Sequence, residues 1–235
     1  MSRYKEHSDY DLQRLLTKCE LLTYRSQVEL RNEIAERGLV YDVSCIDTEI
    51  AKTISDIDEL KHLKDLGFEV ISTENAIILT RATRAVVADV VSLVLGTLFV
   101  LLGLAALLVF IASFRDEIGL VLSTANYIFC FILIGLGIAG VKMLSGFQRL
   151  FKYQDFKLEI TQNRVVLHKR ENSKVQQYKK ELSALKLITF KEEIALQLDG
   201  ITVIKTEQSN ILQKKTLIAF LDKVNTLYAN KEENL

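Results

Sequence analysis

Cysteine and histidine are scarce in this sequence, which contains three of each. Cys19, Cys45 and Cys130 form no C-x-x-C pair, and the histidines are too far apart in sequence to complete a cluster. This spacing excludes the usual zinc sites, and we predict neither a metal nor a cofactor. We expect all three cysteines to be free thiols, because the segment before the apolar region is predicted below to be cytoplasmic.

The sequence also lacks the motifs that carry common enzyme chemistry. It contains no G-x-S-x-G, no G-x-x-x-x-G-K-[ST], no H-E-x-x-H and no EF-hand loop. Its local concentration of glycine lies within an apolar stretch, where small residues favour helix packing over phosphate binding. We therefore predict that the protein is not an enzyme.

The chain has no excess of charge of either sign, since 30 basic residues balance 30 acidic ones. Basic pairs such as Lys169-Arg170 and Lys179-Lys180 are interspersed with acids, and no series of stacking aromatics accompanies them. Nucleic-acid binding is therefore not expected.

Charge is almost absent between residues 85 and 144, where the only residues with a formal charge are Asp89, Arg115, Asp116, Glu117 and Lys142. A helix needs about 20 predominantly apolar residues to cross a bilayer. The stretch is long enough for two such helices, which we place at 86–114 and 118–144. The pattern predicts a transmembrane helical hairpin.

The distribution of basic residues predicts the orientation of this hairpin. Those that flank its two ends are Arg81, Arg84, Lys142, Arg149 and Lys152, whereas the connection offers only Arg115. Basic residues near span ends stay on the cytoplasmic side. The sequence opens with a charged segment in place of the apolar core of a signal peptide. We expect a multi-pass protein of the bacterial inner membrane with both termini in the cytoplasm.

Residues 1–67 have the pattern of a helical module with three amphipathic helices. Ser8 and Asp11 form a capping box at the first, the second spans 24–37 before Gly38, and the third spans 47–66. We expect them to pack on one another or on the C-terminal domain. Residues 8–39 resemble a short helical module at the N-terminus of many bacterial membrane proteins, which implies no activity.

Two β-hairpins are predicted on either side of the apolar region. Residues 68–81, within a segment that we bound at 68–84, and residues 156–169 share one pattern without a gap: Phe68 aligns with Phe156, Thr73 with Thr161 and Leu79 with Leu167. Any hairpin needs aliphatic runs around a polar turn, which accounts for much of the likeness. The alternative is an internal duplication, or two hairpins joined in one sheet.

The segment 155–230 predicts an antiparallel β-domain closed by one helix. Strand-like runs occur at 156–160, 164–169, 174–178, 182–190, 194–198 and 201–206. Asp199-Gly200 is a strong hairpin signal. An amphipathic helix then extends to about residue 228, with Leu217, Phe220 and Val224 on its apolar face.

A membrane hairpin that leads through Phe151-Lys152-Tyr153 into the strand pair 156–167, and then into 178–186, is similar to bacterial membrane proteins with a pleckstrin-homology-like domain. The resemblance implies a long central strand at 182–190 and a closing helix. The sequence offers one strand too few after the apolar region, and residues 77–80 could supply it. The expected fold is α+β: helical module, transmembrane hairpin and PH-like β-domain.

Small residues within the predicted spans indicate where helices come together. We expect Gly135 and Ala139, one turn apart in the second span, to form a packing face that Gly103 and Gly96 of the first span could oppose.

Two polar residues stand out in the predicted membrane region. Asp89 is close to the cytoplasmic end, where Arg84 or Lys142 could neutralise it, and Asn126 is toward the outer end. An ionisable residue in a span is a functional candidate. A structural role is the favoured interpretation of both.

Basic residues after the second span are candidates for contact with lipid or with a partner: Arg149, Lys152, Lys169 and Arg170. Each such residue near an anionic leaflet gains about 1 kcal/mol. The leading hypothesis is a non-enzymatic adaptor or structural subunit of a membrane complex, whose hairpin self-associates or binds another membrane protein. The alternative is a ligand-gated effector or small channel, which would need a polar stripe along a span.

Overall fold

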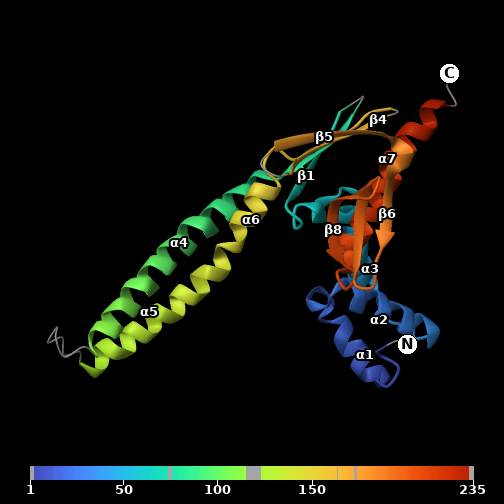
Figure 1. Cartoon of the computed structure of the whole chain (residues 1–235). Coiled ribbons are helices and arrows are strands. Elements are labelled where there is room, and N and C mark those ends of the chain that lie inside the picture. Colours follow the sequence, from blue (N-terminus) through green and yellow to red (C-terminus); the bar gives the residue numbers. More distant parts are fainter. Residues whose placement is uncertain (1–2, 74–75, 115–122, 163, 172–173, 233–235) are drawn as a thin grey trace. The chain divides into compact units, whose positions relative to one another are not determined.

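The computed structural model describes residues 3–73, 76–114, 123–162, 164–171 and 174–232 (Figure 1), and its α+β class is the predicted one. The α-helices are α1 (Asp9–Leu16), α2 (Tyr24–Glu36), α3 (Ser44–Asp58), α4 (Thr83–Ala112), α5 (Thr124–Met143), α6 (Ser145–Lys152) and α7 (Ile211–Glu232). The strands are β1 (Phe68–Ser72), β2 (Ile77–Arg81), β3 (Lys157–Ile160), β4 (Arg164–Glu171), β5 (Lys174–Glu181), β6 (Leu185–Thr189), β7 (Glu193–Leu198) and β8 (Ile201–Glu207).

The chain divides into two compact units. The hairpin unit comprises Gly67–Leu182, with α4, α5, α6 and the strands β1 to β5. The helical unit comprises Met1–Leu66 and Ser183–Leu235, with α1 to α3, β6 to β8 and α7. This division differs from the predicted β-domain at 155–230, whose strands are split between the two units.

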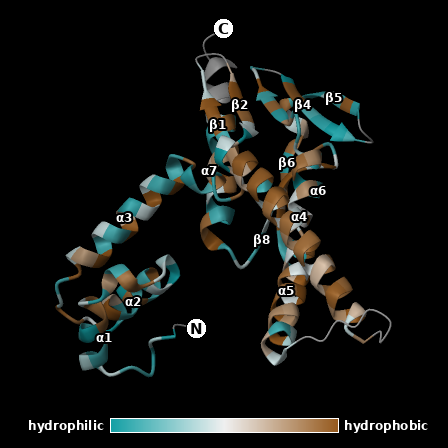
Figure 2. Ribbon diagram, turned by 90° about the vertical axis from the view of Figure 1, so that its left-hand side faces the viewer, coloured by the Kyte–Doolittle hydropathy of each residue, from teal (hydrophilic) through white to brown (hydrophobic). Residues whose placement is uncertain are grey.

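In the hairpin unit, α4 and α5 lie side by side as an antiparallel pair, and both are apolar along their length (Figure 2). They are close to the predicted spans, although residues 115–122 fall outside the described part of the chain. Each is long and apolar enough to cross a membrane, and only 17% and 18% of their most apolar windows are buried. Most of their apolar surface is therefore exposed.

Glycine contacts hold α4 and α5 together. A Cβ atom added at Gly103 would lie 2.7 Å from Gly137 Cα, and one added at Gly140 would lie 2.7 Å from the carbonyl oxygen of Gly96. Any larger residue would force the two backbones apart. Gly96 and Gly103 therefore lie at the contact between the two helices, and their partners are Gly140 and Gly137.

Strands β1 to β5 form one antiparallel sheet in chain order. Strand β2 pairs with β3, with Leu79 opposite Leu158, so the hairpins before and after α4 and α5 join in one sheet, as one of the alternatives from the sequence had it. Its most buried positions lie on one face of the sheet: Ile77, Leu79, Leu158, Ile160, Val165 and Leu167.

The turns of the two hairpins have the same hydrogen-bond pattern. The amide and the hydroxyl of Thr73 both donate to the carbonyl oxygen of Ala76, over 2.8 and 2.9 Å. The amide and hydroxyl of Thr161 likewise donate to the carbonyl oxygen of Arg164, over 2.9 and 3.1 Å. The sequence likeness of the two segments thus extends to the hydrogen bonds that begin each turn.

In the helical unit, α1 to α3 pack around a common core formed by Tyr4, Leu12, Leu16, Cys19, Leu30, Ile34 and Ile46. The capping box predicted at Ser8 and Asp11 is confirmed. Cys19 and Cys45 form a disulfide with their Cα atoms 6.4 Å apart, so the prediction of free thiols is wrong at these two positions. The fold brings them together although they are 26 residues apart in sequence. Cys130 is free and buried.

The third helix is shorter than predicted. α3 ends at Asp58, because Leu60 adopts a left-handed conformation with φ of 61°, and a 3-10 turn follows at Lys61–Leu63. A single left-handed leucine costs roughly 1 to 2 kcal/mol. The turn allows Leu60 and Leu63 both to be buried next to α7.

Strands β6 to β8 form a separate antiparallel sheet with β7 in the centre. The predicted long strand at 182–190 is only the five-residue β6, preceded by a 3-10 turn. α7 packs against β6, β8 and α3 through its apolar face, on which Leu217, Phe220 and Val224 are fully or almost fully buried. The helical module therefore packs on the C-terminal helix, as expected.

Candidate functional site

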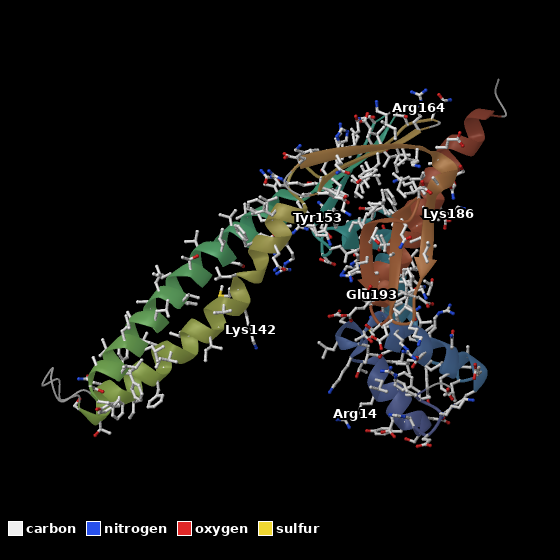
Figure 3. All side chains as sticks on the ribbon, viewed as in Figure 1. Arg14, Lys142, Tyr153, Arg164, Lys186 and Glu193 are labelled. Atoms are coloured by element: carbon white, nitrogen blue, oxygen red, sulfur yellow. A yellow bond between two sulfur atoms is a disulfide. The ribbon has the colours of Figure 1, made fainter. Side chains whose placement is uncertain are left out.

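The junction between the apolar helices and the five-stranded sheet combines an ion pair, a cluster of aromatic rings and a cavity. Only Ala82 separates β2 from α4, and four residues, 153–156, separate α6 from β3. Because both connections are short, the first turn of α4 and the last turn of α6 are held directly against the sheet. Figure 3 shows Tyr153 at this point, where α6 reaches the strands.

An ion pair between strand and helix lies at the centre of the junction. The guanidinium of Arg81, the last residue of β2, donates to a carboxylate oxygen of Asp89 over 2.7 Å, and their side chains are only 12% and 9% exposed. A second nitrogen of Arg81 donates to the carbonyl oxygen of Gly67 over 3.3 Å. Asp89 is therefore neutralised by Arg81, and not by Arg84 or Lys142 as predicted.

A cluster of three aromatic rings lies at the Arg81 guanidinium, and two of the rings contact it. Phe68, Tyr153 and Phe156 have ring centroids between 5.1 and 5.8 Å apart, in edge-to-face arrangements. Arg81 lies 5.1 Å from the centroid of Tyr153 and 5.6 Å from that of Phe68. Such cation–π contacts contribute up to about 2 kcal/mol when they are shielded from water.

A cavity of about 420 Å³ opens beside this ion pair. Its apolar walls come from Val86 and Val90 of α4, from Leu150 of α6 and from Phe156. Its polar groups come from Thr80, Arg81, Asp89, Tyr153, Gln154 and Asp155. A mostly apolar cavity with a few convergent polar groups is typical of a binding site.

α6 presents an aromatic and basic surface next to the cavity. The rings of Phe147 and Phe151 are both exposed and lie 4.7 Å apart, while Arg149 and Lys152 are exposed on the same short helix. Arg170 of β4 lies 5.4 Å from the centroid of Phe151 and donates to the side-chain oxygen of Gln154. Exposed aromatics with adjacent cations are typical of a membrane interface.

The structure brings only part of the predicted set together. Asp89 lines the cavity, and Lys152, Arg149 and Arg170 lie on or beside α6, near it. Lys169 forms an ion pair with Glu171 over 3.4 Å and alternates with Arg170 along β4, so the two basic neighbours point to opposite faces of the sheet. The predicted pair of lipid contacts at 169 and 170 is therefore split.

The remaining predicted residues lie along α5. Asn126 is exposed in the first turn of α5, where its backbone N–H donates to the carbonyl oxygen of Ser123 over 3.0 Å. Gly135 and Ala139 are exposed, and a Cβ atom at Gly135 would meet nothing within 4 Å. The prediction that Gly103 opposes them is wrong, because Gly103 packs on Gly137. The Gly135 and Ala139 face is instead left uncovered by α4.

Arg81 and Tyr153 are the residues that sequence reasoning missed. Arg81 follows Ile77 and Leu79 at every second position of β2, which places it on the same, buried face of the sheet and was a usable signal. Tyr153 lies in a connection, where no periodicity indicates the direction of its side chain.

No group of three or more histidine, cysteine or acidic residues suited to a metal occurs among the described residues. No family model, curated protein or solved structure matches this chain. The chemistry of the site must therefore be read from its own residues. These residues offer an ion pair, aromatic rings and an amphipathic cavity, which suit binding.

Proposed function

We propose that this chain is a non-enzymatic protein of the bacterial inner membrane, in which α4 and α5 cross the bilayer as a hairpin and both units lie in the cytoplasm and bind partner proteins. The observation that carries the proposal is the exposure of the apolar hairpin, since over four-fifths of the most apolar window of each helix is unburied. In a soluble protein, helices of this composition form the core. Lipid is the environment that suits such a surface.

The glycine contacts support the role of α4 and α5 as one rigid anchor. Helices in lipid gain little from apolar burial against each other, so close backbone packing supplies much of their association. The four glycines at the α4 and α5 contact satisfy this requirement within the chain. The exposed small residues Gly135 and Ala139 then remain for contact with a second copy or with another membrane protein.

The strand order supports a PH-like arrangement of the soluble part. Strand β2, paired with β3, supplies the strand that the segment after the hairpin lacks. The five-stranded sheet β1 to β5 belongs to the hairpin unit, and the three-stranded sheet β6 to β8, followed in the chain by α7, belongs to the helical unit. We infer that this part of the chain serves as a binding domain for a protein partner.

A ligand-gated effector is the second candidate, and the cavity beside Asp89 favours it because α4 and α6 both line that cavity. A pore is less well supported. The hydroxyl of Thr97 donates to the carbonyl oxygen of Leu93 within its own helix, over 2.8 Å, so this hydroxyl is satisfied without a polar partner outside the helix. The hairpin is therefore better suited to anchoring than to conduction.

Extraction of bacterial membranes with alkaline carbonate tests the proposal. The wild-type chain should stay in the membrane pellet and dissolve only in detergent. Leu101→Arg with Leu104→Arg places two cations on exposed positions near the centre of the span, at a cost of about 2.5 to 3.5 kcal/mol each, and should reduce insertion. Tyr10→Arg with Leu21→Arg adds the same charge to exposed positions of the helical unit and should leave membrane insertion unchanged. A folded wild-type protein in the soluble fraction would contradict the proposal.

A further inference from the structure

The cavity beside Arg81 is continuous with the exposed surface of α4. Val86 and Val90 line it and are 39% and 43% exposed, and Val94, one turn further along the same face, is 61% exposed. If the hairpin crosses a bilayer, as proposed above, this row faces lipid. A lipid chain that lies along the row reaches the cavity without leaving an apolar surface.

The cavity also lies at the depth of the lipid headgroups. Asp89 is about 9 Å from the start of α4, at 1.5 Å per residue. The remainder of the helix, from Val90 to Ala112, extends about 34 Å and covers the roughly 30 Å hydrocarbon core. The polar groups of the cavity therefore fall at the boundary between hydrocarbon and water.

The charges of the cavity suit a cationic group better than an anion. Two carboxylates, Asp89 and Asp155, and one guanidinium, Arg81, line it. Because Arg81 and Asp89 form an ion pair, Asp155 supplies the remaining charge, and within the described part of the chain its exposed carboxylate has no ion pair. Aromatic rings of Tyr153 and Phe156 beside it favour a cation further.

The surroundings of the cavity suit an anion. Lys152 lies with its ammonium 5.5 Å from the ring centroid of Tyr153, and Arg149 is exposed on the same helix, α6. The carboxylate of Asp155 suits an ammonium group, and the ammonium of Lys152 suits a phosphate next to it. The valine row suits an apolar chain of the same ligand. The headgroup of an aminophospholipid has this order of groups.

We propose that this cavity binds a phospholipid with a primary-amine headgroup, of the phosphatidylethanolamine class. Its ammonium donates to Asp155, its phosphate lies at Lys152, and one acyl chain follows Val86, Val90 and Val94. An anionic lipid without an amine would place its charge near Asp155, which disfavours it. This inference rests on the proposed membrane location.

Native mass spectrometry of the full chain tests the inference. The protein, purified in mild detergent, is offered phosphatidylethanolamine, phosphatidylcholine and phosphatidylglycerol with identical acyl chains. Charge-assisted hydrogen bonds contribute about 1.5 to 3 kcal/mol, so phosphatidylethanolamine should be retained about tenfold or more over phosphatidylcholine, whose quaternary amine cannot donate. Asp155→Asn should remove this preference. Glu159→Gln, which removes a carboxylate outside the cavity lining, should keep it.

The asparagine variant is chosen because Asp155 has a φ of 59°, a conformation that asparagine tolerates. Equal retention of phosphatidylethanolamine and phosphatidylcholine by the wild-type protein would overturn the inference, and so would a preference for phosphatidylglycerol. Displacement by free phosphoethanolamine as effective as by the whole lipid would assign the cavity to a soluble ligand and overturn it too. Failure of the wild-type chain to enter membranes would instead contradict the proposed function.

Discussion

At the scale of single residues, the buried ion pair of Arg81 and Asp89 determines how the sheet meets the helices. A buried pair contributes little net stability relative to apolar residues, but loss of one partner leaves the other charge without compensation. The pair therefore fixes which residues meet at the junction. The rings of Phe68 and Tyr153 contact the guanidinium of Arg81 and restrict its position.

We predict that Asp89→Ala lowers the stability of the full chain in detergent by about 3 kcal/mol, because Arg81 stays buried without its carboxylate. Arg81→Met combined with Asp89→Leu should regain much of this loss, since no buried charge remains. Arg84→Met changes an exposed cation two residues into α4 and serves as the control. Thermal unfolding followed by circular dichroism measures all four proteins. Equal unfolding of Asp89→Ala and Arg84→Met would contradict the role of the pair.

Residue contacts were the least predictable part of the site. The sequence indicated that Asp89 needs a cation, but Arg84, the nearest basic residue in sequence, is not the partner. Arg81 ends β2 one residue before α4, and its side chain reaches Asp89 in the second turn of that helix. The disulfide was missed for a similar reason: Cys19 approaches Cys45 only because α3 packs against the 3-10 turn at Cys19–Leu21.

At the scale of elements, α5 has two small-residue faces with different roles. Gly137 and Gly140 contact α4, whereas Gly135 and Ala139 are uncovered. The sequence predicted that glycines pack the hairpin, but it could not say which ones. Consecutive residues differ by about 100° around a helix, so Gly135 and Gly137 differ by about 200°, and only the rotation of α5 relative to α4 decides which of them faces α4.

Leucine substitutions separate the two faces. Gly103→Leu should destabilise the hairpin by more than 1 kcal/mol, because the new side chain meets the backbone at Gly137. Gly135→Leu with Ala139→Leu has open space and should leave the melting temperature in detergent unchanged, while chemical cross-linking between chains decreases. If the double variant melts earlier and cross-links normally, the uncovered face serves no association.

At the scale of the whole chain, a long stretch with few charges was sufficient to predict the apolar hairpin, and periodicity was sufficient to predict both β-hairpins and the C-terminal helix. The pairing of β2 with β3, about 80 residues apart, was one of the alternatives that the sequence offered. The separation of β6 to β8 into a second sheet was not predicted, because strand pairing between distant segments leaves no local signal.

Two observations disagree about the compartment of the helical unit. A disulfide is typical of oxidising compartments. The basic residues that flank the hairpin favour the cytoplasm. The proposal gives more weight to the charges, because five flanking cations oppose the single Arg115.

Labelling of single cysteines in intact bacterial cells tests the central claim, that α4 and α5 cross the membrane with both units on the cytoplasmic side. Cysteine is placed at Lys5, at Asp116 in the connection outside the described residues, or at Ser209, with the three native cysteines replaced by alanine. A membrane-impermeant maleimide should label position 116 alone, and all three should react after detergent lysis. Labelling of position 5 or 209 in intact cells would contradict the account.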